Sequence, residues 1–291
     1  MNYVPTQPEA SSDIRALLQG RILSRLFRQR VVDHLETVTG KSSHSHGSHV
    51  VDRMVLKGGM AMRVAHQSVR QTKDIDLDAD HDVSLGCVQG AMRRAIKEAT
   101  SGNWLTEVKV TEPKQTATVA RWKIQGTLPE TGAIVHLTVE VSFRHHLEPG
   151  ETVNVPYGEP CAPAQVQVYR DEVLLLNKVE AFFSPVRDAP RDVMDMFLLF
   201  KAGVALAPET LAARLSQASC PNLIETLWAK LDQMDEARFQ AEILPHWDPN
   251  QVPPEWRDWA GIRLFVGEKL EAMLKHVPAR GAATRHTGCR G

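Results

Sequence analysis

A glycine pair and an aspartate pair, close together in the sequence, predict chemistry on phosphate. Gly58 and Gly59 precede the triplet Asp74-Ile75-Asp76, with a run of helical character between them. Glycine lets the backbone approach a ligand closely, so amide groups at a turn into a helix can bind phosphate oxygens. Asp74 and Asp76 are two residues apart, so on a β-strand their carboxylates point to the same face. Close carboxylates repel each other unless a cation lies between them, and Mg²⁺ prefers oxygen ligands. The pattern therefore predicts a metal beside a nucleoside triphosphate.

A third carboxylate is predicted on a second strand. Apolar and polar side chains alternate over residues 133–143, and Glu140 lies in the middle of the polar face. Together with Asp74 and Asp76, Glu140 would allow two Mg²⁺ or Mn²⁺ ions to bind. One ion would lower the pKa of an attacking hydroxyl group, and the other would neutralise the triphosphate and the leaving pyrophosphate. The alternative is a strand whose charged face is simply solvated.

Other charged residues flank this motif. Lys57 and Arg70 are candidates for neutralising phosphate, and each also has a simple explanation as a solvent-facing side chain. Asp78 and Asp80 have the same parity as Asp74 but lie towards the end of the predicted strand. We interpret these two acids as solvated side chains.

A second group of charged residues follows in a region of helical pattern. Lys178 lies among apolar residues of the helix predicted over 171–183. Asp192 and Asp195 lie one turn apart at the start of the helix predicted over 191–203, where they can share a face. Spacing alone favours a surface lysine with its aliphatic part on apolar neighbours, and acids that suit the helix dipole.

The elements that must position these residues indicate an α+β protein. A loop rich in proline and glycine over 149–163 marks a domain boundary. The sequence therefore predicts an α+β domain over 1–160, a helical domain over 161–276 and a mobile basic tail over 277–291. The other predicted strands are 73–79, 104–110 and 117–125, and the other predicted helices are 88–99, 208–218, 221–233 and 255–276.

Two N-terminal segments also carry charged or metal-binding side chains. Apolar residues recur with helical spacing from residue 14 to residue 35, interleaved with arginines. We interpret these arginines as the solvated face of a helix; a nucleic-acid contact is the alternative. His44, His46 and His49 lie in a polar segment that reads as a surface loop, with metal binding as the alternative.

The composition indicates a soluble cytoplasmic protein without a membrane partner. The chain has 291 residues, 43% of them hydrophobic, and a formal net charge of −1. This charge excludes a strongly basic nucleic-acid-binding protein but leaves room for a local basic surface. Four scattered cysteines indicate reduced thiols, and neither a signal peptide nor a membrane span is recognisable.

Four motifs in order resemble the AbiEii/AbiGii family of nucleotidyltransferase toxins, which belong to type IV toxin–antitoxin systems and include the MenT-type toxins. The resemblance covers about residues 54 to 200. The motifs are LKGG at 56–59, R-x-T-x-D-I-D-L at 70–77, D-E followed by N-K-x-E-A at 171–181, and R-D-x-x-D at 191–195. The resemblance implies a fold like that of the DNA polymerase β nucleotidyltransferases, with a small mixed sheet flanked by helices and extended by a helical bundle.

The resemblance also implies roles for single residues. Gly58 and Gly59 match the phosphate-binding glycines, Arg70 the basic residue of the second motif, and Asp74 and Asp76 the metal-binding aspartates. Lys178 matches a lysine expected to contact the triphosphate. Asp192 and Asp195 match the motif that supplies an active-site acid, with Asp192 slightly favoured. One departure is Met60, where related enzymes commonly carry a serine or threonine that contacts phosphate.

The implied function is transfer of a nucleotide from an NTP to the 3′ end of tRNA, which would inhibit translation. A cognate antitoxin is an implied partner. The alternatives are transfer to a protein or a small molecule, and a non-catalytic nucleotide-binding protein with the same fold.

Overall fold

A computed structural model describes most of the chain. The described residues are 7–27, 48–66, 68, 71–148, 150–155, 165–216, 222–247 and 252–277. The chain divides into two compact units, residues 1–170 and 171–291. Arg70, the predicted domain boundary at 160, most of the histidine-containing segment and nearly all of the predicted tail lie outside the described residues. No helix in the described ranges is both long and apolar enough to cross a lipid bilayer.

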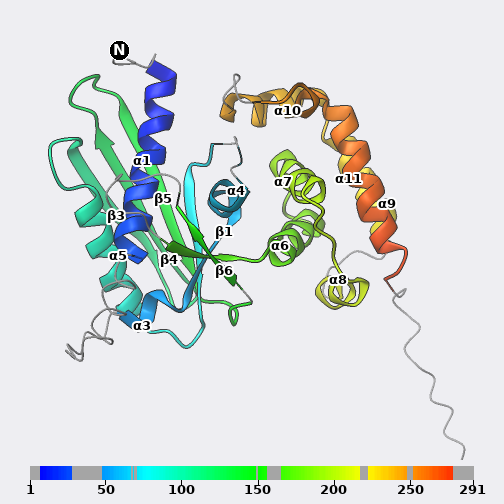
Figure 1. Cartoon of the computed structure of the whole chain (residues 1–291), viewed down its shortest axis with the longest axis horizontal. Helices are drawn as coiled ribbons and strands as arrows, with labels where there is room; N and C mark the ends of the chain where they lie inside the picture. The colour runs from blue at the N-terminus through cyan, green and yellow to red at the C-terminus, as the bar shows by residue number, and fades with distance from the viewer. Residues whose placement is uncertain are drawn as a thin grey trace, which may run out of the picture. The chain divides into compact units, whose positions relative to one another are not determined.

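The first unit is built on one mixed sheet. Among the described residues, seven strands lie in the order β3-β4-β5-β2-β1-β7-β6 (Figure 1). The pairs β2–β5 and β1–β7 are parallel, and the other neighbours are antiparallel. The strands are β1 (Met54–Lys57), β2 (Asp74–Ala79), β3 (Thr106–Gln115), β4 (Val119–Thr127), β5 (Ile134–Ser142), β6 (Gly150–Asn154) and β7 (Gln165–Tyr169).

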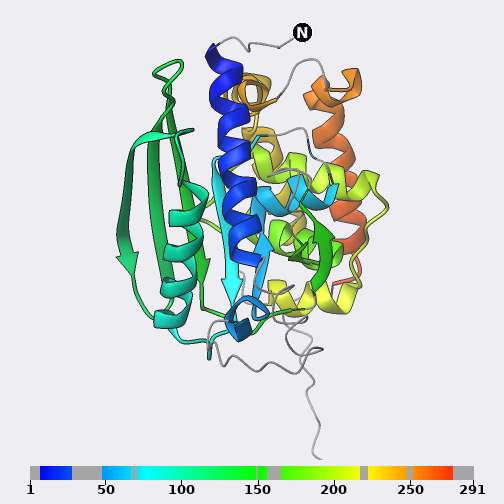
Figure 2. The same cartoon turned by 60° about the vertical axis from the view of Figure 1, so that its left-hand side comes forward.

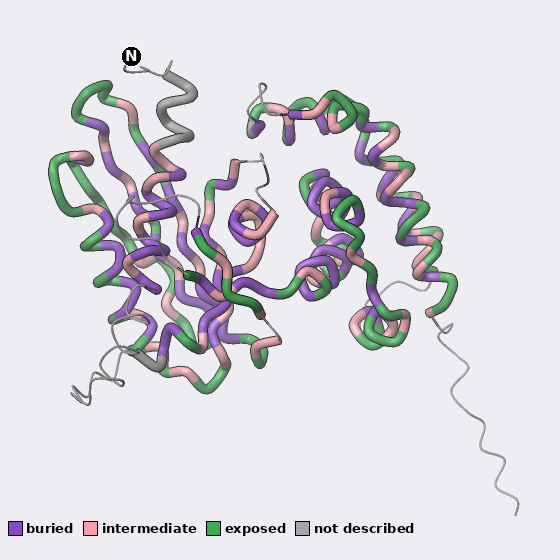
Figure 3. The backbone as a smooth tube through the Cα atoms, in the orientation of Figure 1, coloured by how far each residue is buried: buried purple, intermediate pink, exposed green. Residues whose placement is uncertain are grey.

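The central strands have one buried and one partly exposed face, as the alternating sequence predicts (Figure 3). In β2, Ile75 and Leu77 are fully buried, whereas Asp74 and Asp76 are partly exposed. The side-chain period of two keeps all the acids of β2 on one face of the sheet. The predicted strand over 73–79 is therefore confirmed to within one residue.

Helices cover the sheet of the first unit. Helices α1 (Gln7–Phe27) and α5 (Leu85–Ala99) lie side by side in front of the sheet (Figure 2). Helix α4 (Gly58–His66) packs against β1 and β2, and α3 (Ser48–Val51) is a single turn. The predicted N-terminal helix is confirmed as far as Phe27, and residues 28–35 of the predicted pattern lie outside the described residues. The prediction of a solvated arginine face is wrong for Arg15 and Arg21. Both are half-buried, and the guanidinium of Arg21 lies 4.4 Å from the ring centroid of Trp104.

The second unit is helical, as predicted. Helix α7 packs against α6, α10 and α11, and its interior side includes the fully buried residues Met196 and Leu199. Short elements absent from the prediction are α10 and two 3₁₀ turns, η1 (Leu244–His246) and η2 (Pro254–Arg257). The helices are α6 (Asp171–Phe183), α7 (Pro190–Lys201), α8 (Pro208–Leu215), α9 (Leu223–Gln233), α10 (Glu236–Glu242) and α11 (Trp259–Leu274).

One predicted loop contains a strand. Residues 150–154, within the loop predicted over 149–163, form β6 at the edge of the sheet and pair with β7. The residues of β6 are exposed or partly exposed, so they show no apolar alternation. The strand exists because β7 offers backbone partners. The α+β class with a mixed sheet and a helical second unit is nevertheless confirmed.

Candidate active site

The first unit brings the three predicted carboxylates onto adjacent strands. In the parallel pairing of β2 with β5, Asp76 lies opposite Glu140, and Asp74 lies opposite Thr138. Residues paired in register point to the same face of a sheet, so the three acids share the partly exposed face. The pairing of β2 with β5 therefore places Glu140 beside the two aspartates.

The glycine pair lies where β1 ends and α4 begins. Gly58 has a φ of +67°, a conformation that only glycine adopts without strain. A Cβ atom on Gly58 would lie 2.7 Å from Oδ2 of Asp76, so the Asp76 carboxylate contacts this glycine. Gly59 follows in the first turn of α4, where backbone amides lack partners within the helix. A carboxylate and an amide-rich helix start therefore meet at one point.

We expect Gly58→Ala to impair both folding and any function of Asp76. The left-handed backbone destabilises alanine by about 1–2 kcal/mol, and the new methyl group must displace the Asp76 carboxylate. Gly132→Ala is a matched control, because Gly132 has a φ of +69° and nothing within 4 Å of its virtual Cβ. Denaturant unfolding and nucleotide transfer should both be measured. Equal loss of transfer in the two variants would contradict the steric argument.

Met60, where the resemblance led us to expect a serine or threonine, is fully buried in α4. Its side chain therefore packs in the core. The backbone amide at this position remains part of the first turn of the helix. The methionine at this position thus contributes to the hydrophobic core.

The predicted phosphate ligand Lys57 is engaged with Asp78. Its ammonium group forms an ion pair with Oδ1 of Asp78, and the hydroxyl of Tyr169 donates to Oδ2 at 2.9 Å. Burial and the charge of Asp78 raise the pKa of Tyr169, so this hydroxyl stays a donor. The interpretation of Asp78 as a solvated acid is therefore wrong, because it links β1, β2 and β7. A contact between Lys57 and a nucleotide stays a prediction.

Glu140 has a cationic partner that the sequence prediction missed. Arg121 lies opposite Glu140 on β4 and donates from Nε to Oε2 at 2.8 Å, with a second hydrogen bond from its terminal nitrogen. A metal at Glu140 would have to share this carboxylate with the guanidinium group. The role of Glu140 as third ligand stays a prediction, and Arg121 is the residue that competes for it.

Helix α1 holds the start of β2. Gln19 is fully buried, and its Nε2 donates to the carbonyls of Thr72 at 3.0 Å and Asp74 at 3.4 Å. Arg15 donates from Nε to the carbonyl of His136 at 3.1 Å. Burial lowers the pKa of Arg15, and attraction to the Asp74 carboxylate acts in the opposite direction. An arginine of α1 is therefore attracted to Asp74, although Lys57 and Arg70 were the predicted sources of positive charge.

The second unit contains a buried ionic cluster made of the other predicted site residues. The ammonium of Lys178 lies 2.6 Å from Oδ2 of Asp195 and 3.1 Å from Oδ1 of Asp192. The side chain of Lys178 is 9% exposed, and those of Asp192 and Asp195 are 1% and 0% exposed. The interpretation of Lys178 as a surface lysine, which spacing alone favoured, is therefore wrong.

Arg187, which sequence reasoning missed, completes this cluster. It binds both oxygens of Asp192, from Nε at 2.6 Å and from a terminal nitrogen at 3.0 Å. Burial by itself raises the pKa of Asp192, but Lys178 and Arg187 more than offset this, so the net shift is downwards. Asp192 therefore remains a carboxylate in a site nearly closed to water. Arg187 lies in the loop before α7, five residues from Asp192, so helical periodicity could not predict that the two residues pair.

Lys230 of α9 holds the loop that carries Arg187. Its ammonium donates to the carbonyls of Phe182 at 2.6 Å, Ser184 at 2.7 Å and Arg187 at 2.8 Å. A cation at the C-terminal end of α6 also suits the helix dipole. We expect Lys230→Met to lower the free energy of unfolding by about 2–4 kcal/mol, because three carbonyls lose a charged donor. Urea unfolding should show a much smaller loss for the exposed Lys269→Met; equal losses would contradict the assignment.

The described site residues thus form two groups. Lys57, Gly58, Gly59, Asp74, Asp76 and Glu140 lie in the first unit, and Lys178, Asp192 and Asp195 lie in the second. Within each unit the predicted residues come together. The first group offers carboxylate oxygens beside backbone amides, which is suited to a metal with phosphate. The second group offers a buried ammonium group held by two carboxylates.

Comparisons with known proteins relate the chain to a family and to solved structures. Residues 47–260 match the family model described as nucleotidyl transferase AbiEii toxin, type IV toxin–antitoxin system. The crystal structure of JHP933 from Helicobacter pylori is similar over 94% of this chain and 95% of its own, with a TM-score of 0.54 and 18% identity. A second H. pylori structure, described as a candidate nucleotidyltransferase, covers 91% of this chain and 96% of its own, with a TM-score of 0.55 and 18% identity. A comparison with curated proteins found no match.

At 18% identity the two structures support the fold alone, whereas the family model matches the amino-acid sequence itself. The matched region contains both groups of candidate residues and more than half of the chain. The predicted fold and family are confirmed. The chain belongs to the AbiEii family of nucleotidyl transferase toxins of type IV toxin–antitoxin systems, and it is a nucleotidyltransferase.

Proposed function

We propose that this protein transfers a nucleotide from an NTP to the 3′ end of tRNA, releases pyrophosphate and thereby inhibits translation. The observation that carries the transfer step is the contact of Asp76 with Gly58 at the start of α4. A metal-binding carboxylate and a phosphate-binding backbone need to be adjacent if one triphosphate is to engage both.

The donor set of the first unit fits a hard divalent cation. Asp74 and Asp76 offer carboxylate oxygens on one partly exposed face, and the glycine at position 58 leaves room for the Asp76 carboxylate. These two residues would hold Mg²⁺ or Mn²⁺, with Glu140 as a third ligand if it yields an oxygen from Arg121. Such an ion, when bound, supplies charge neutralisation for the triphosphate and activation of the attacking hydroxyl.

The chain's own residues would then bind and orient the nucleotide. Amides of Gly58 and Gly59 at the N-terminus of α4 favour phosphate oxygens. Lys178 is proposed to contact the triphosphate: an ammonium group has three donors, so it can keep Asp192 and Asp195 and still bind one phosphate oxygen. In this arrangement the two aspartates position the lysine. We propose Arg70 as a further phosphate ligand only because it matches the basic residue of the family motif.

Family membership supports the acceptor and the partners. The type IV toxin–antitoxin assignment makes a cognate antitoxin an expected partner, and we propose that the reaction takes place in the cytoplasm. The tRNA 3′ end is proposed from the resemblance to MenT-type toxins. Half-buried arginines of α1 are already engaged with protein groups, so they give the tRNA contact no additional support.

The test is incubation of the protein with each labelled NTP, Mg²⁺ or Mn²⁺, and total tRNA. We expect label on tRNA with one or a few NTPs, and loss of that label when periodate has first destroyed the 3′-terminal diol. Label on a protein or on a small molecule would show that one of these alternatives, and not tRNA, is the acceptor. Transfer to none of the acceptors, despite nucleotide binding, would favour a non-catalytic protein.

A further inference from the structure

A cluster of two histidines and one aspartate lies apart from the proposed catalytic residues. Asp80 and His81 directly follow β2, and His146 lies in the segment after β5. Strands β2 and β5 are parallel neighbours, with Asp78 opposite Ser142. The segments that follow the two strands therefore leave the sheet at the same end. Asp80 is four residues beyond Asp76, about 13 Å along an extended strand. The cluster is thus separated from Asp74 and Asp76 along the direction of the strand.

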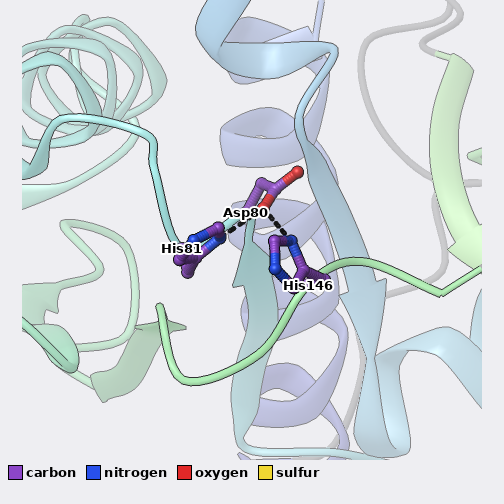
Figure 4. A group of neighbouring side chains, drawn as sticks. All are labelled: Asp80, His81 and His146. Atoms are coloured by element: carbon purple, nitrogen blue, oxygen red, sulfur yellow. Dashed lines mark hydrogen bonds and ion pairs between the residues drawn. The ribbon is translucent and has the colours of Figure 1, made fainter.

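The three side chains converge on one point (Figure 4). Nδ1 of His81 lies 3.1 Å from Oδ1 of Asp80, and Nδ1 of His146 lies 3.4 Å from the same oxygen. One ligand atom from each residue lies within 4.8 Å of the other two. Two ligands about 2.05 Å from a tetrahedral zinc ion are about 3.3 Å apart. The two nitrogen–oxygen separations are therefore close to those of ligands around a single ion.

Neighbouring groups hold the aspartate in this orientation. Arg53 binds Oδ2 of Asp80 at 3.0 Å and also pairs with Asp82, so the cation is balanced by a second carboxylate. The backbone N–H of Asp80 donates to the carbonyl of Arg53 at 3.1 Å, and the N–H of Val83 donates to the carbonyl of Asp80 at 3.0 Å. Oδ1 is thereby directed at the histidines, as an outer partner directs a metal ligand.

The electrostatics of the cluster also suit a cation. Asp80 supplies a carboxylate oxygen that faces both imidazole rings, while its other oxygen is held by Arg53. The two imidazole rings are 3.9 Å apart, centroid to centroid, at an interplanar angle of 67°.

We propose that Asp80, His81 and His146 form a second metal site, which binds a divalent transition metal such as Zn²⁺. Two imidazoles and one carboxylate favour zinc over the magnesium expected at Asp74 and Asp76. The side chains of His81 and His146 are 49% and 78% exposed, so the site is open to water, unlike a closed structural zinc site. The bound ion would tie the segment after β5 to the end of β2.

Zinc titration of the full chain by calorimetry, in excess Mg²⁺, tests this site. A background of His44→Ala, His46→Ala and His49→Ala removes the other histidine-rich segment. We expect one equivalent of zinc in this background, with affinity reduced at least tenfold by His146→Ala and by Asp80→Asn. His145→Ala is the matched control, since His145 is the exposed neighbour outside the cluster, and it should keep full affinity.

Thermal unfolding gives a second readout. Zinc should raise the melting temperature of the background variant, because a ligand that binds only the folded state stabilises it, and His146→Ala should abolish this rise. Asp76→Asn should still bind zinc, which separates this site from the proposed catalytic one. The proposal is overturned if no zinc binds, if His146→Ala and His145→Ala bind equally well, or if Asp76→Asn is the variant that loses zinc.

Discussion

Replacing Asp76 by asparagine should abolish nucleotidyl transfer and leave the protein folded. The substitution removes the charge of a carboxylate proposed to bind the metal but keeps the size of the side chain beside Gly58. Loss of several kcal/mol of charge stabilisation in the transition state corresponds to a loss of about 10³-fold or more in kcat/KM. Transfer of labelled nucleotide under single-turnover conditions measures this directly. Asp74→Asn should behave in the same way.

Glu130→Gln is the matched control for this experiment. It makes the same carboxylate-to-amide change at an exposed position of the first unit, and its activity should be unchanged. Circular dichroism and unfolding curves show whether Asp76→Asn is folded. A folded Asp76→Asn variant that retains transfer would contradict the assignment of Asp76 as a metal ligand.

Glu140→Gln separates two roles of the third carboxylate. If Glu140 binds metal, its loss should reduce transfer and make it depend on higher Mg²⁺ concentrations. If it only anchors Arg121, transfer should persist, because the strand pairing between β4 and β5 does not require the ion pair. The same assay therefore decides whether the metal has two or three protein ligands.

Replacing Lys178 by methionine should destabilise the second unit by about 3–5 kcal/mol. The substitution leaves two buried carboxylates without their shared ammonium group, and an uncompensated buried charge is strongly destabilising. Arg187 still pairs with Asp192, so part of the buried negative charge stays balanced. Urea unfolding of the full chain measures the change.

The double substitution Lys178→Met with Asp195→Leu tests this explanation. Replacing a buried ion pair by apolar residues of similar volume is often neutral or stabilising, so the double variant should recover much of the lost stability. Lys201→Met, at an exposed lysine of α7, should change stability by less than about 0.5 kcal/mol. If Lys178→Met is no less stable than Lys201→Met, the ion pairs of Lys178 do not hold the helices together.

Transfer activity separates the structural role of Lys178 from its proposed role at the triphosphate. The double variant, compared with wild type at equal folded fraction, should still lose transfer if Lys178 binds phosphate. Recovery of both stability and transfer in the double variant would assign Lys178 to the core alone.

Periodic features of the chain were predictable because they are local. The alternation in β2 and β5 places Asp76 and Glu140 on polar faces whatever the remaining chain does. The helical spacing of residues 171–183 predicts α6 with the bounds that the structure has. β6 was missed, because an exposed edge strand takes its conformation from its partner β7 and carries no apolar pattern of its own.

The partners of the charged residues could not be predicted in this way. Spacing showed Lys178 as a helix residue among apolar neighbours, but its burial against Asp192 and Asp195 depends on how α6 and α7 pack. Asp78 was interpreted as solvated, although Tyr169, 91 residues further along the chain, binds it. No local period encodes such a contact.

The sequence by itself therefore determined the family and the candidates for its chemistry: the glycine pair, the acids of β2 and the lysine and aspartates of the second unit, in an order typical of one enzyme family. The tertiary structure alone decided what each of these groups touches. Asp76 lies against Gly58, Glu140 is bound by Arg121, and Asp80 faces two histidines. The physical reason is that side-chain periodicity is set within one element, whereas ion pairs and metal ligands are set by strand register and helix packing between elements distant in the chain.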